Sequence, residues 1–414
     1  MSTSSAYGAS WFSILWANIK DRLRGQSSRA NARRGYIRPP IDPQALNKSS
    51  RQGKSQVIWI KTDGDYTSVL LAAELLGAIR QKRLDVRLVL TFEDDYPEIY
   101  RSRFRAMAKI GVGYDVCDLN SALVRALERL EPLGVITVGK ALGNNLVEQL
   151  HQKKIHSIAF QTSCGQGKSF PAQSIEASYP AYHSLKPDKE MAAYQAEPTD
   201  MTTLVVNPQV EPTLGKALGL TETQSIYWAH LPKNTSNPLM VQTLLKLWRD
   251  SGLSEQHFLC LSMDDSFGQG LATLEQWKNH KDVQVILLSQ WDRQPLKKPH
   301  ILLMDEARWM PALSSIADAC YVHQYRSLPV WQIIASGTQL YFERDGDFPL
   351  PVQQGGQCKA TSLQDWVELI SRGEKEKIEI ESRNDGDRRR KYFWEERRKA
   401  QLILDELLQR IYDW

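Results

Sequence analysis

The chain contains few cysteines, and none of them stands in a disulfide or zinc motif. Five cysteines are spread over 414 residues without a C-x-x-C pair, at Cys117, Cys164, Cys260, Cys320 and Cys358. An odd number at wide spacing argues against a disulfide framework and a structural zinc site, and fits a reducing compartment. Cys117, Cys260 and Cys320 lie in apolar runs and are predicted to be buried hydrophobic side chains rather than nucleophiles.

Long apolar runs, strong net charge and metal-ligand spacing are also missing. The first apolar segment is far shorter than the ~20 residues that cross a bilayer, and no small-residue cleavage site follows it, so neither a spanning helix nor a signal peptide is expected. A formal net charge of +4 gives no reason to expect a nucleic-acid partner. No metal or other cofactor is expected. The segment GQGKS at 165–169 lacks the spacing of a phosphate-binding loop.

The composition is that of a soluble protein with more than one core. With 42% hydrophobic and 24% charged residues, the chain has enough apolar surface to bury two cores of common size. Global disorder is therefore excluded, and two domains are expected.

The N-terminal segment has an apolar stripe followed by basic residues. In SWFSILWANIKDRLR (10–24), Trp11, Leu15, Ile19 and Leu23 recur every fourth residue, with Phe12 and Trp16 beside them. Six cations follow the start of this stripe, at Lys20, Arg22, Arg24, Arg29, Arg33 and Arg34. This arrangement favours a helix that lies on the cytoplasmic face of an anionic membrane. The alternative is a helix that packs on its own domain.

Apolar runs alternate with helical patterns through both halves of the chain. In the first half, strands are predicted at 57–60, 86–92, 134–138 and 156–160, and helices at 68–80, 100–110 and 144–154. In the second half, strands are predicted at 224–230, 257–263, 283–289, 300–305, 319–323 and 338–343, and helices at 239–250, 309–316 and 388–411. Such alternation predicts an α/β fold with two doubly wound, Rossmann-like domains that face a cleft.

The predicted organisation has four segments. Residues 1–50 would form the membrane-association segment, 51–207 the acceptor domain, 208–380 the donor domain, and 381–414 a helix that packs back on the N-terminal domain. The polar stretch 161–203 interrupts the pattern and predicts loops and short helices, with a last strand at 202–207.

Several segments resemble the Kdo transferases, which move an acidic eight-carbon sugar from a CMP-linked donor to a lipid A precursor. The resemblance is clearest in the amphipathic and basic N-terminus, SVLLAAELLGAIR (68–80), ALGNNLVEQLHQKKI (141–155) and HILLMDEARWMPALSSIADACYV (300–322). The final helix around 389–394 also fits. It implies the glycosyltransferase B architecture, a nucleotide-sugar donor, and a lipid or glycan acceptor of the cell envelope.

The resemblance implies a general base after the first strand. The family has a Gly-Glu there, and an ungapped comparison places Ser68 at that position. A slightly longer loop would instead place Gly64 and Asp65 of KTDGDYTS there, and Asp65 is then the expected base, because doubly wound sheets place their chemistry at strand ends. The alternative is a turn in which Asp63 and Asp65 are both solvated.

Other family positions are substituted. On the acceptor side, VGKALG replaces two carboxylates, which leaves Ser68, Lys140 and Asn144 as the expected contacts. MDDS, with Asp264 and Asp265, replaces a basic loop and would repel a phosphate. The glycine-rich donor elements are shortened to HQYRSLPVWQ, with Gln332 where the family has a glutamate. The expected donor contacts are His230, Lys233, Asp305, His323, Gln324, Arg326 and Gln332.

Two functions follow from these observations. The first is transfer of an activated sugar, of the CMP-linked acidic kind that the resemblance implies, by a peripheral protein of the inner face of the cytoplasmic membrane. The second is a catalytically inactive scaffold or partner subunit, which has kept the fold and lost the chemistry. An occupied nucleotide site would favour the first, and the substituted donor loops favour the second.

Overall fold

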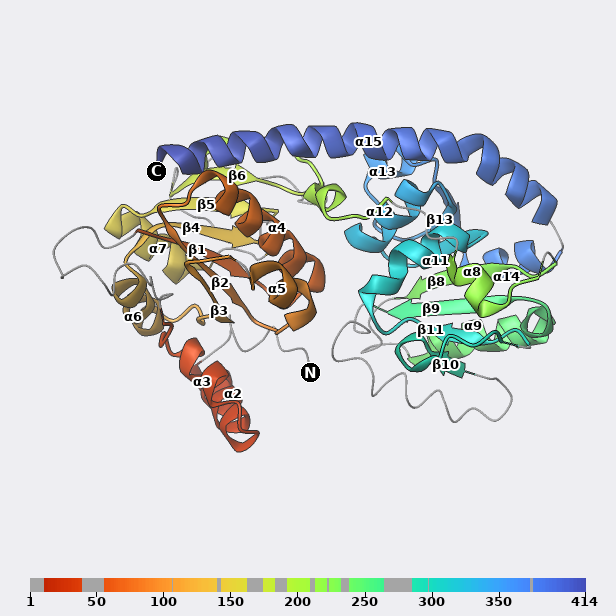
Figure 1. The fold of residues 1–414 in the computed structure, drawn as a ribbon, viewed down its shortest axis with the longest axis horizontal. Coiled ribbons are helices and arrows are strands. Elements are labelled where there is room, and N and C mark those ends of the chain that lie inside the picture. Colours follow the sequence, from red (N-terminus) through yellow and green to blue (C-terminus); the bar gives the residue numbers. More distant parts are fainter. Residues whose placement is uncertain are drawn as a thin grey trace. The chain divides into compact units, whose positions relative to one another are not determined.

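The computed structural model divides the chain into two compact units. Unit 1 comprises Met1–Val205 and Lys399–Trp414, and unit 2 comprises Val206–Arg398 (Figure 1). The structure describes residues 11–38, 56–105, 107–139, 143–161, 174–182, 192–208, 213–221, 223–231, 238–263, 285–296, 298–372 and 375–414.

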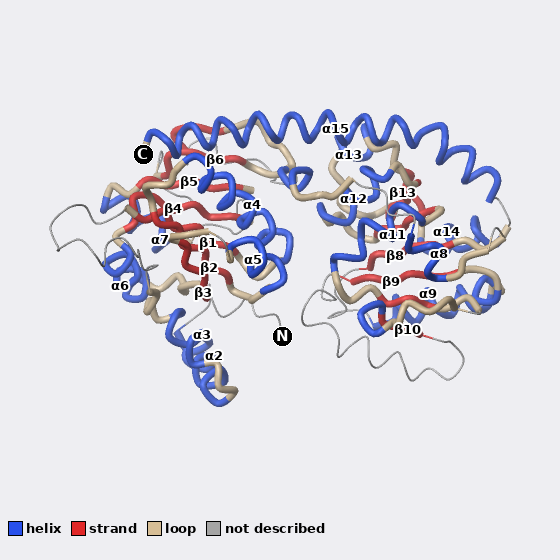
Figure 2. The backbone as a smooth tube through the Cα atoms, in the orientation of Figure 1, coloured by secondary structure: helices blue, strands red, loops and turns tan. Residues whose placement is uncertain are grey.

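Unit 1 is built on a seven-stranded sheet whose order is β3-β2-β1-β4-β5-β6-β7 (Figure 2). The strands are β1 (Val57–Thr62), β2 (Arg87–Phe92), β3 (Ile110–Tyr114), β4 (Pro132–Val138), β5 (His156–Phe160), β6 (Ile175–Tyr179) and β7 (Ala192–Gln195). All neighbouring strands pair in parallel. The helices between them are α4 (Tyr66–Lys82), α5 (Pro97–Phe104), α6 (Asn120–Leu130) and α7 (Asn144–Lys153).

The two faces of this sheet bury different sets of side chains. Ile58 and Ile60 of β1 pack in one core with α4 and the last turns of α15 (Lys375–Asp413). Val57 and Trp59 pack in the other core with α6 and α7. Because successive side chains of a strand point to opposite faces, a strand that is apolar throughout needs helices on both sides. This is the doubly wound arrangement.

The N-terminal helices α2 (Trp11–Leu23) and α3 (Ser27–Arg33) are fixed to unit 1 by ion pairs. Arg33 lies 2.5 Å from Asp21, which joins the two helices. Arg29 donates hydrogen bonds to Asp94 (2.6 Å) and to the Glu93 carbonyl (2.7 Å), beyond the end of β2. Among the described residues, no helix has the length and apolar character needed to span a bilayer.

Unit 2 has a second parallel sheet of seven strands, in the order β10-β11-β9-β8-β12-β13-β14. The strands are β8 (Ile226–Leu231), β9 (Phe258–Met263), β10 (Val285–Leu287), β11 (Ile301–Leu303), β12 (Ala319–Val322), β13 (Gln339–Glu343) and β14 (Lys359–Thr361). The helices are α8 (Thr213–Leu218), α9 (Pro238–Asp250), α11 (Met310–Ile316), α12 (Ser327–Ser336), α13 (Leu350–Gly355) and α14 (Leu363–Ser371). Two Rossmann-like α/β domains are therefore confirmed.

The core of unit 2 is rich in tryptophan. Trp248 of α9 and Trp366 of α14 pack with Tyr227 of β8 on one face of the sheet. Cys260 and Cys320 are fully buried, as is Cys117 in unit 1, and burial raises the pKa of all three thiols. The prediction that these cysteines are buried hydrophobic side chains is confirmed.

Three sequence predictions about elements are wrong. The helix expected at 100–110 ends at Phe104, and the strand β3 (Ile110–Tyr114) follows it. The stretch 161–203 contains two strands, β6 and β7, rather than only loops and short helices. The strand expected at 202–207 is a short 3-10 helix at Met201–Leu204, capped by the Asp200 carboxylate.

Candidate functional site

The carboxyl edge of the unit 1 sheet contains the topological switch point of that domain. From β1 the chain proceeds outward through β2 and β3 on one side, and then through β4 and β5 on the other. Adjacent connections leave this edge in opposite directions, and open α/β sheets bind ligands at such a point. The residues that follow β1 and β4 are therefore the first to consider.

The turn after β1 gives its two aspartates different roles. The Asp65 carboxylate caps α4 by accepting the backbone N–H of Ser68 at 3.2 Å, so it serves the helix that it begins. Asp63 precedes the helix, and its carboxylate accepts the backbone N–H of Asp65 at 3.0 Å. Asp65 is exposed and Asp63 is partly buried.

Glycines let the neighbouring strands approach this turn closely. A Cβ on Gly64 would lie 2.6 Å from Asp94 Oδ2. Gly139, which follows β4, has a positive φ of 72°, and a Cβ there would overlap the Ser68 hydroxyl and approach Asp63 Oδ2 to 3.4 Å. Only a residue without a side chain fits at this position. The main chain after β4 therefore lies against Asp63.

The surroundings of Asp63 raise the pKa of its carboxyl group to about 7. The largest cause is removal from water, and the next is the negative charge of Asp65. Glu93 adds a smaller increase, while the hydrogen bonds from Asp65 and Ser68 act in the opposite direction. A carboxyl group with this pKa can take up and release a proton near neutral pH, as general acid–base catalysis requires.

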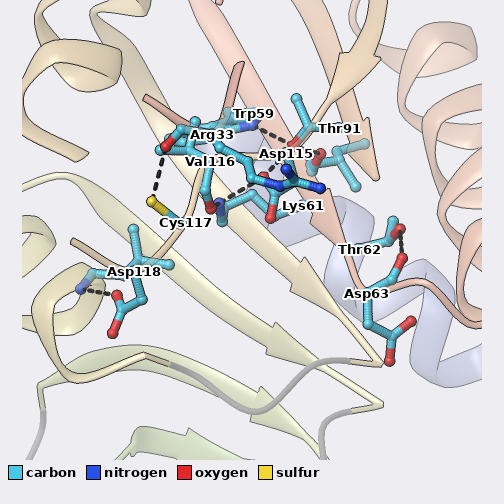
Figure 3. A network of polar contacts seen from close by, with 12 residues as sticks. Arg33, Trp59, Lys61, Thr62, Asp63, Thr91, Asp115, Val116, Cys117 and Asp118 are labelled. Carbon is cyan, nitrogen blue, oxygen red and sulfur yellow. Dashed lines mark hydrogen bonds and ion pairs between the residues drawn. The ribbon is translucent and has the colours of Figure 1, made fainter. Parts of the chain in front are cut away.

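A buried ion pair lies further along the same edge (Figure 3). Lys61 of β1 is 2.7 Å from Asp115, and both side chains are buried. Thr91 donates its hydroxyl to Asp115 at 2.8 Å, and the Trp59 indole donates to Thr91 at 2.9 Å. The Lys61 ammonium also lies 4.4 Å from the centre of the Trp59 ring. Pairing of this kind is what permits charges inside a sheet.

The acceptor-side residues expected from the sequence have different surroundings. Ser68 is buried in the first turn of α4, beside Gly139. Asn144 is exposed at the start of α7, where its neighbour Asn145 donates to the Asp118 carbonyl at 2.7 Å. Lys140 lies outside the described residues. The structure thus brings Ser68, but not Asn144, to Asp63.

In unit 2, His230 and Asp305 are held by neighbouring serines. His230, near the end of β8, has its Nδ1 atom 2.7 Å from the Ser262 hydroxyl, which also accepts the Trp228 indole N–H at 2.8 Å. Asp305 follows β11 and accepts both the backbone N–H and the hydroxyl of Ser289. These contacts orient the two side chains at the carboxyl edge of the sheet.

His323, Gln324 and Arg326 follow β12 at the same edge. Glu343, at the end of β13, accepts the Tyr321 hydroxyl at 2.5 Å and lies 3.4 Å from His323 Nδ1. Burial lowers the pKa of His323 despite the opposing effect of Glu343, which favours the neutral form of this imidazole. Gln324 and Arg326 are exposed.

The Gln332 side chain is buried and forms hydrogen bonds within unit 2. It is buried in α12, and its amide nitrogen donates to the Asn207 carbonyl at 2.7 Å, with the Ser314 hydroxyl at 3.5 Å. The expectation that Gln332 contacts a donor stays a prediction, and its amide is bonded within unit 2 in this structure. Lys233, the loop with Asp264 and Asp265, and the segment 165–169 lie outside the described residues. Within the described ranges, no group of three or more His, Cys, Asp or Glu side chains is arranged to hold a metal ion.

The chain is similar in fold to solved structures that are named as UDP-GlcNAc 2-epimerases or were solved with a uridine nucleotide. A UDP-GlcNAc 2-epimerase from Neisseria meningitidis, solved with UDP-GlcNAc bound, matches 85% of this chain and 100% of its own at 10% identity, with a TM-score of 0.55. A putative UDP-N-acetylglucosamine 2-epimerase from Listeria monocytogenes matches 80% of this chain and 91% of its own at 10% identity, with a TM-score of 0.51. S. aureus MnaA, solved with UDP, matches 77% of this chain and 87% of its own at 10% identity, with a TM-score of 0.50.

These likenesses show the fold alone, because the identities are far below those of close relatives. No protein-family model matches the chain, and no curated protein matches it in sequence. Together with the two parallel sheets, the solved structures show a fold of the glycosyltransferase B type. They do not bear on the finer resemblance to Kdo transferases, which stays a prediction.

Proposed function

We propose that this protein transfers a sugar from a nucleotide donor to an acceptor hydroxyl, with Asp63 as the general base. The observation that carries the proposal is the Asp63 carboxyl group, which stands at the switch point of the unit 1 sheet with a pKa raised to about 7. The fold supports it, since structures of this type bind UDP and UDP-GlcNAc.

Asp63 suits the role better than Asp65, the residue chosen from the sequence. Asp65 is exposed, and one of its oxygens is occupied by the first turn of α4. Its charge instead raises the pKa of Asp63, which brings that group close to the pH at which it works. Asp65 therefore acts through Asp63, as a positioning and tuning residue.

The reaction needs one proton acceptor and one site for the leaving group. The acceptor oxygen forms a bond to the anomeric carbon and gives its proton to the Asp63 carboxylate. The bond between the anomeric carbon and the phosphate oxygen breaks, and its electron pair leaves with the nucleotide. Groups that stabilise the charge of the leaving phosphate lower the barrier to this step.

The carboxyl edge of the unit 2 sheet is the proposed donor site. Arg326 provides a permanent positive charge there, and His230, Asp305, His323 and Gln324 provide polar groups. The resemblance to Kdo transferases favours a CMP-linked acidic sugar, whereas the bound ligands of the solved structures are uridine nucleotides. The class shared by both is a sugar linked to a pyrimidine nucleotide.

The proposed acceptor is a lipid or glycan of the cell envelope, met at the inner face of the cytoplasmic membrane. The exposed apolar residues of α2 support this location, because a helix with one apolar face and adjacent cations binds membrane interfaces.

The second candidate function is an inactive scaffold or partner subunit that binds another protein. Gln332 favours it, since the residue at the position of the family's donor-binding glutamate is buried and bonded to Asn207. A protein of this kind would bind no sugar nucleotide.

A thermal-shift screen of CMP, UDP and their sugar conjugates separates the two functions. A ligand at a hundred times its dissociation constant stabilises the folded protein by ~2.7 kcal/mol, which corresponds to a midpoint rise of roughly 5–10 °C for a domain of this size. Arg326→Gln should reduce the rise, whereas Arg372→Gln, at an exposed arginine that follows α14, should leave it unchanged. If no nucleotide raises the unfolding midpoint of the wild-type protein, the proposal of an enzyme is wrong and that of an inactive scaffold takes its place.

A further inference from the structure

Helix α2 exposes an apolar face while its opposite face is anchored to unit 1. The exposed fractions of Phe12, Trp16 and Leu23 are 75%, 71% and 84%. Leu15 and Ile19, one turn apart on the same face, are each 42% exposed. The buried side chains of the helix include Ile14, Asn18 and Asp21, and the last of these pairs with Arg33.

Phe12, Trp16 and Leu23 are therefore largely exposed, while Ile14 of the same helix is buried in the core of unit 1. The helix contacts the rest of unit 1 through Ile14 and Ala17 and through the buried polar side chains of Asn18 and Asp21. Burying a large apolar side chain contributes about 1.5–3 kcal/mol, so a face with five of them is normally covered by something.

A hollow of about 420 Å³ lies beside this face, between α2, the end of α3 and the start of α6. Leu15 and Ile19 form part of its wall and belong at the same time to the exposed face. The described lining also contains four arginines and no carboxylate; the arginines are Arg22, Arg33, Arg34 and Arg125. The hollow therefore has an apolar side and a strongly positive side.

Beside this hollow, three arginines gather around Tyr36, which lines the neighbouring hollow together with Arg34 and Arg129. The guanidinium carbons of Arg34, Arg125 and Arg129 lie 5.7, 4.8 and 5.8 Å from the centre of the Tyr36 ring. The ring attracts each cation, but the three cations repel one another. Arg125 donates to the Arg34 carbonyl and Arg129 to the Ile37 carbonyl, both neutral acceptors. Among the described residues, none of the three forms an ion pair with a carboxylate.

Arg33 differs from the other arginines of the hollow, because Asp21 neutralises it. Arg22, Arg34 and Arg125 keep their charge. An anion in the hollow would relieve the repulsion between Arg34 and Arg125 and offset the charge of Arg22, and arginine is the side chain best suited to phosphate oxygens.

We propose that this hollow binds the phosphate of an anionic phospholipid, with Arg22, Arg34 and Arg125 as its contacts and the apolar face of α2 in the headgroup region of the bilayer. The site goes beyond the sugar-transfer reaction and does not depend on it. Continuity of the apolar wall with the exposed face selects a membrane lipid over an acidic peptide, because the same ligand then contacts both. Arg38 and Arg129 line the neighbouring hollow, together with Asp95, on the other side of Arg34.

The test is sedimentation of the full chain with vesicles of phosphatidylcholine alone or with one third phosphatidylglycerol. Each cation near an anionic surface contributes about fivefold in partitioning, so Arg22→Gln, Arg34→Gln and Arg125→Gln together should lower binding to the anionic vesicles roughly 100-fold. Phe12→Ser with Trp16→Ser should lower binding to both kinds of vesicle.

The matched control removes three exposed cations elsewhere in unit 1, with Arg101→Gln, Arg105→Gln and Lys153→Gln. Both triple variants have the same net charge, so a specific site predicts a much smaller loss for the control. Because Arg125 holds α3, the double variant Arg22→Gln, Arg34→Gln keeps that hydrogen bond and should still lose roughly 20-fold.

Three results would overturn the proposal. The control could lose as much binding as the hollow variant, which would reduce the effect to net charge. The wild type could fail to bind anionic vesicles. It could also bind an acidic peptide or inorganic phosphate, measured by thermal shift, while ignoring vesicles. None of these readouts uses sugar transfer, so failure here and failure of the proposed function are separate results.

Discussion

Asp63 and Asp65 are two residues apart, yet their surroundings give them different chemistry. Asp65 caps α4 and is solvated, while Asp63 is drawn against Ser68 and the main chain at Gly139. The same turn therefore combines an exposed carboxyl group that caps a helix with one whose charged form is disfavoured. This pairing is typical of sites in which one carboxyl group exchanges protons.

The raised pKa of Asp63 has a consequence for stability. Its folded-state pKa of about 7 lies above the ordinary 3.8, so the folded protein holds this proton more tightly than the unfolded chain between those values. Deprotonation therefore weakens the fold as the pH rises through this window, and the loss is complete above it. Asp63→Asn, which cannot ionise, should be the more stable protein above pH 7.

Thermal unfolding from pH 4 to pH 9 checks this prediction. After allowance for partial exposure, the gain at pH 8 should be about 1–2 kcal/mol, or roughly 2–6 °C in the midpoint, and it should vanish toward pH 4. Asp347→Asn, at an exposed carboxyl group, should show no such dependence. A variant less stable than wild type at pH 8 would contradict the assignment of the raised pKa.

The site could be predicted from the sequence only as far as the turn. The sequence KTDGDYTS follows an apolar run, which indicated the end of a strand and hence the right location. The choice between the two aspartates depends on Glu93 and Gly139, which the fold brings from other strands. The cation cluster at Tyr36 could not be predicted from the sequence either, because it brings α6 together with a segment some ninety residues earlier.

At the scale of elements, the end of α15 is part of the unit 1 core. Arg83, at the end of α4, donates to the carbonyls of Ile411 (2.9 Å) and Tyr412 (3.3 Å), and so binds the last turn of the helix. Trp414 stacks on His156 and lies over Gly134 of β4. A side chain at position 134 would overlap the Trp414 ring, so only glycine fits at this position of β4 when Trp414 packs against it.

Gly134→Ala should therefore displace Trp414 and destabilise the protein by about 1–3 kcal/mol, the usual cost of overpacking. The control is Gly113→Ala in β3, where a Cβ would meet nothing within 4 Å. In a urea-unfolding cycle, Gly134→Ala should cost almost nothing when Trp414→Ala is already present. Equal costs in both backgrounds would show that the two residues do not interact.

The strands of unit 1 that the sequence failed to predict share a weak apolar signal. In β3 the sequence IGVGY has two glycines, and no side chain of this edge strand is fully buried. The sequence therefore contained no strand signal there, and its helical periodicity led to a helix predicted as far as residue 110. β6 and β7 lie in a polar stretch and are only five and four residues long. The central strands β1, β2, β4 and β5 were predictable because burial on both faces requires continuous apolar runs.

At the scale of the whole molecule, two Rossmann-like units divide the chemistry in the proposed mechanism. Unit 1 supplies the base and unit 2 the donor edge, so a change at Asp63 should affect transfer without affecting nucleotide binding. This separation is what distinguishes a working transferase from a scaffold that has kept only the fold.

The most direct test is the pH dependence of nucleotide release from the sugar nucleotide that stabilises the wild type, measured for wild type, Asp63→Asn and Asp65→Asn. Wild-type kcat/KM should rise with pH through about 7, where Asp63 loses its proton. Asp65→Asn keeps the helix cap and removes the neighbouring charge, so its profile should move to lower pH with activity retained. Asp63→Asn should lose about 10²–10⁴-fold in turnover and bind the donor as tightly as wild type. The opposite pattern, in which Asp63→Asn keeps its activity and Asp65→Asn loses it, would contradict the account and make Asp65 the base.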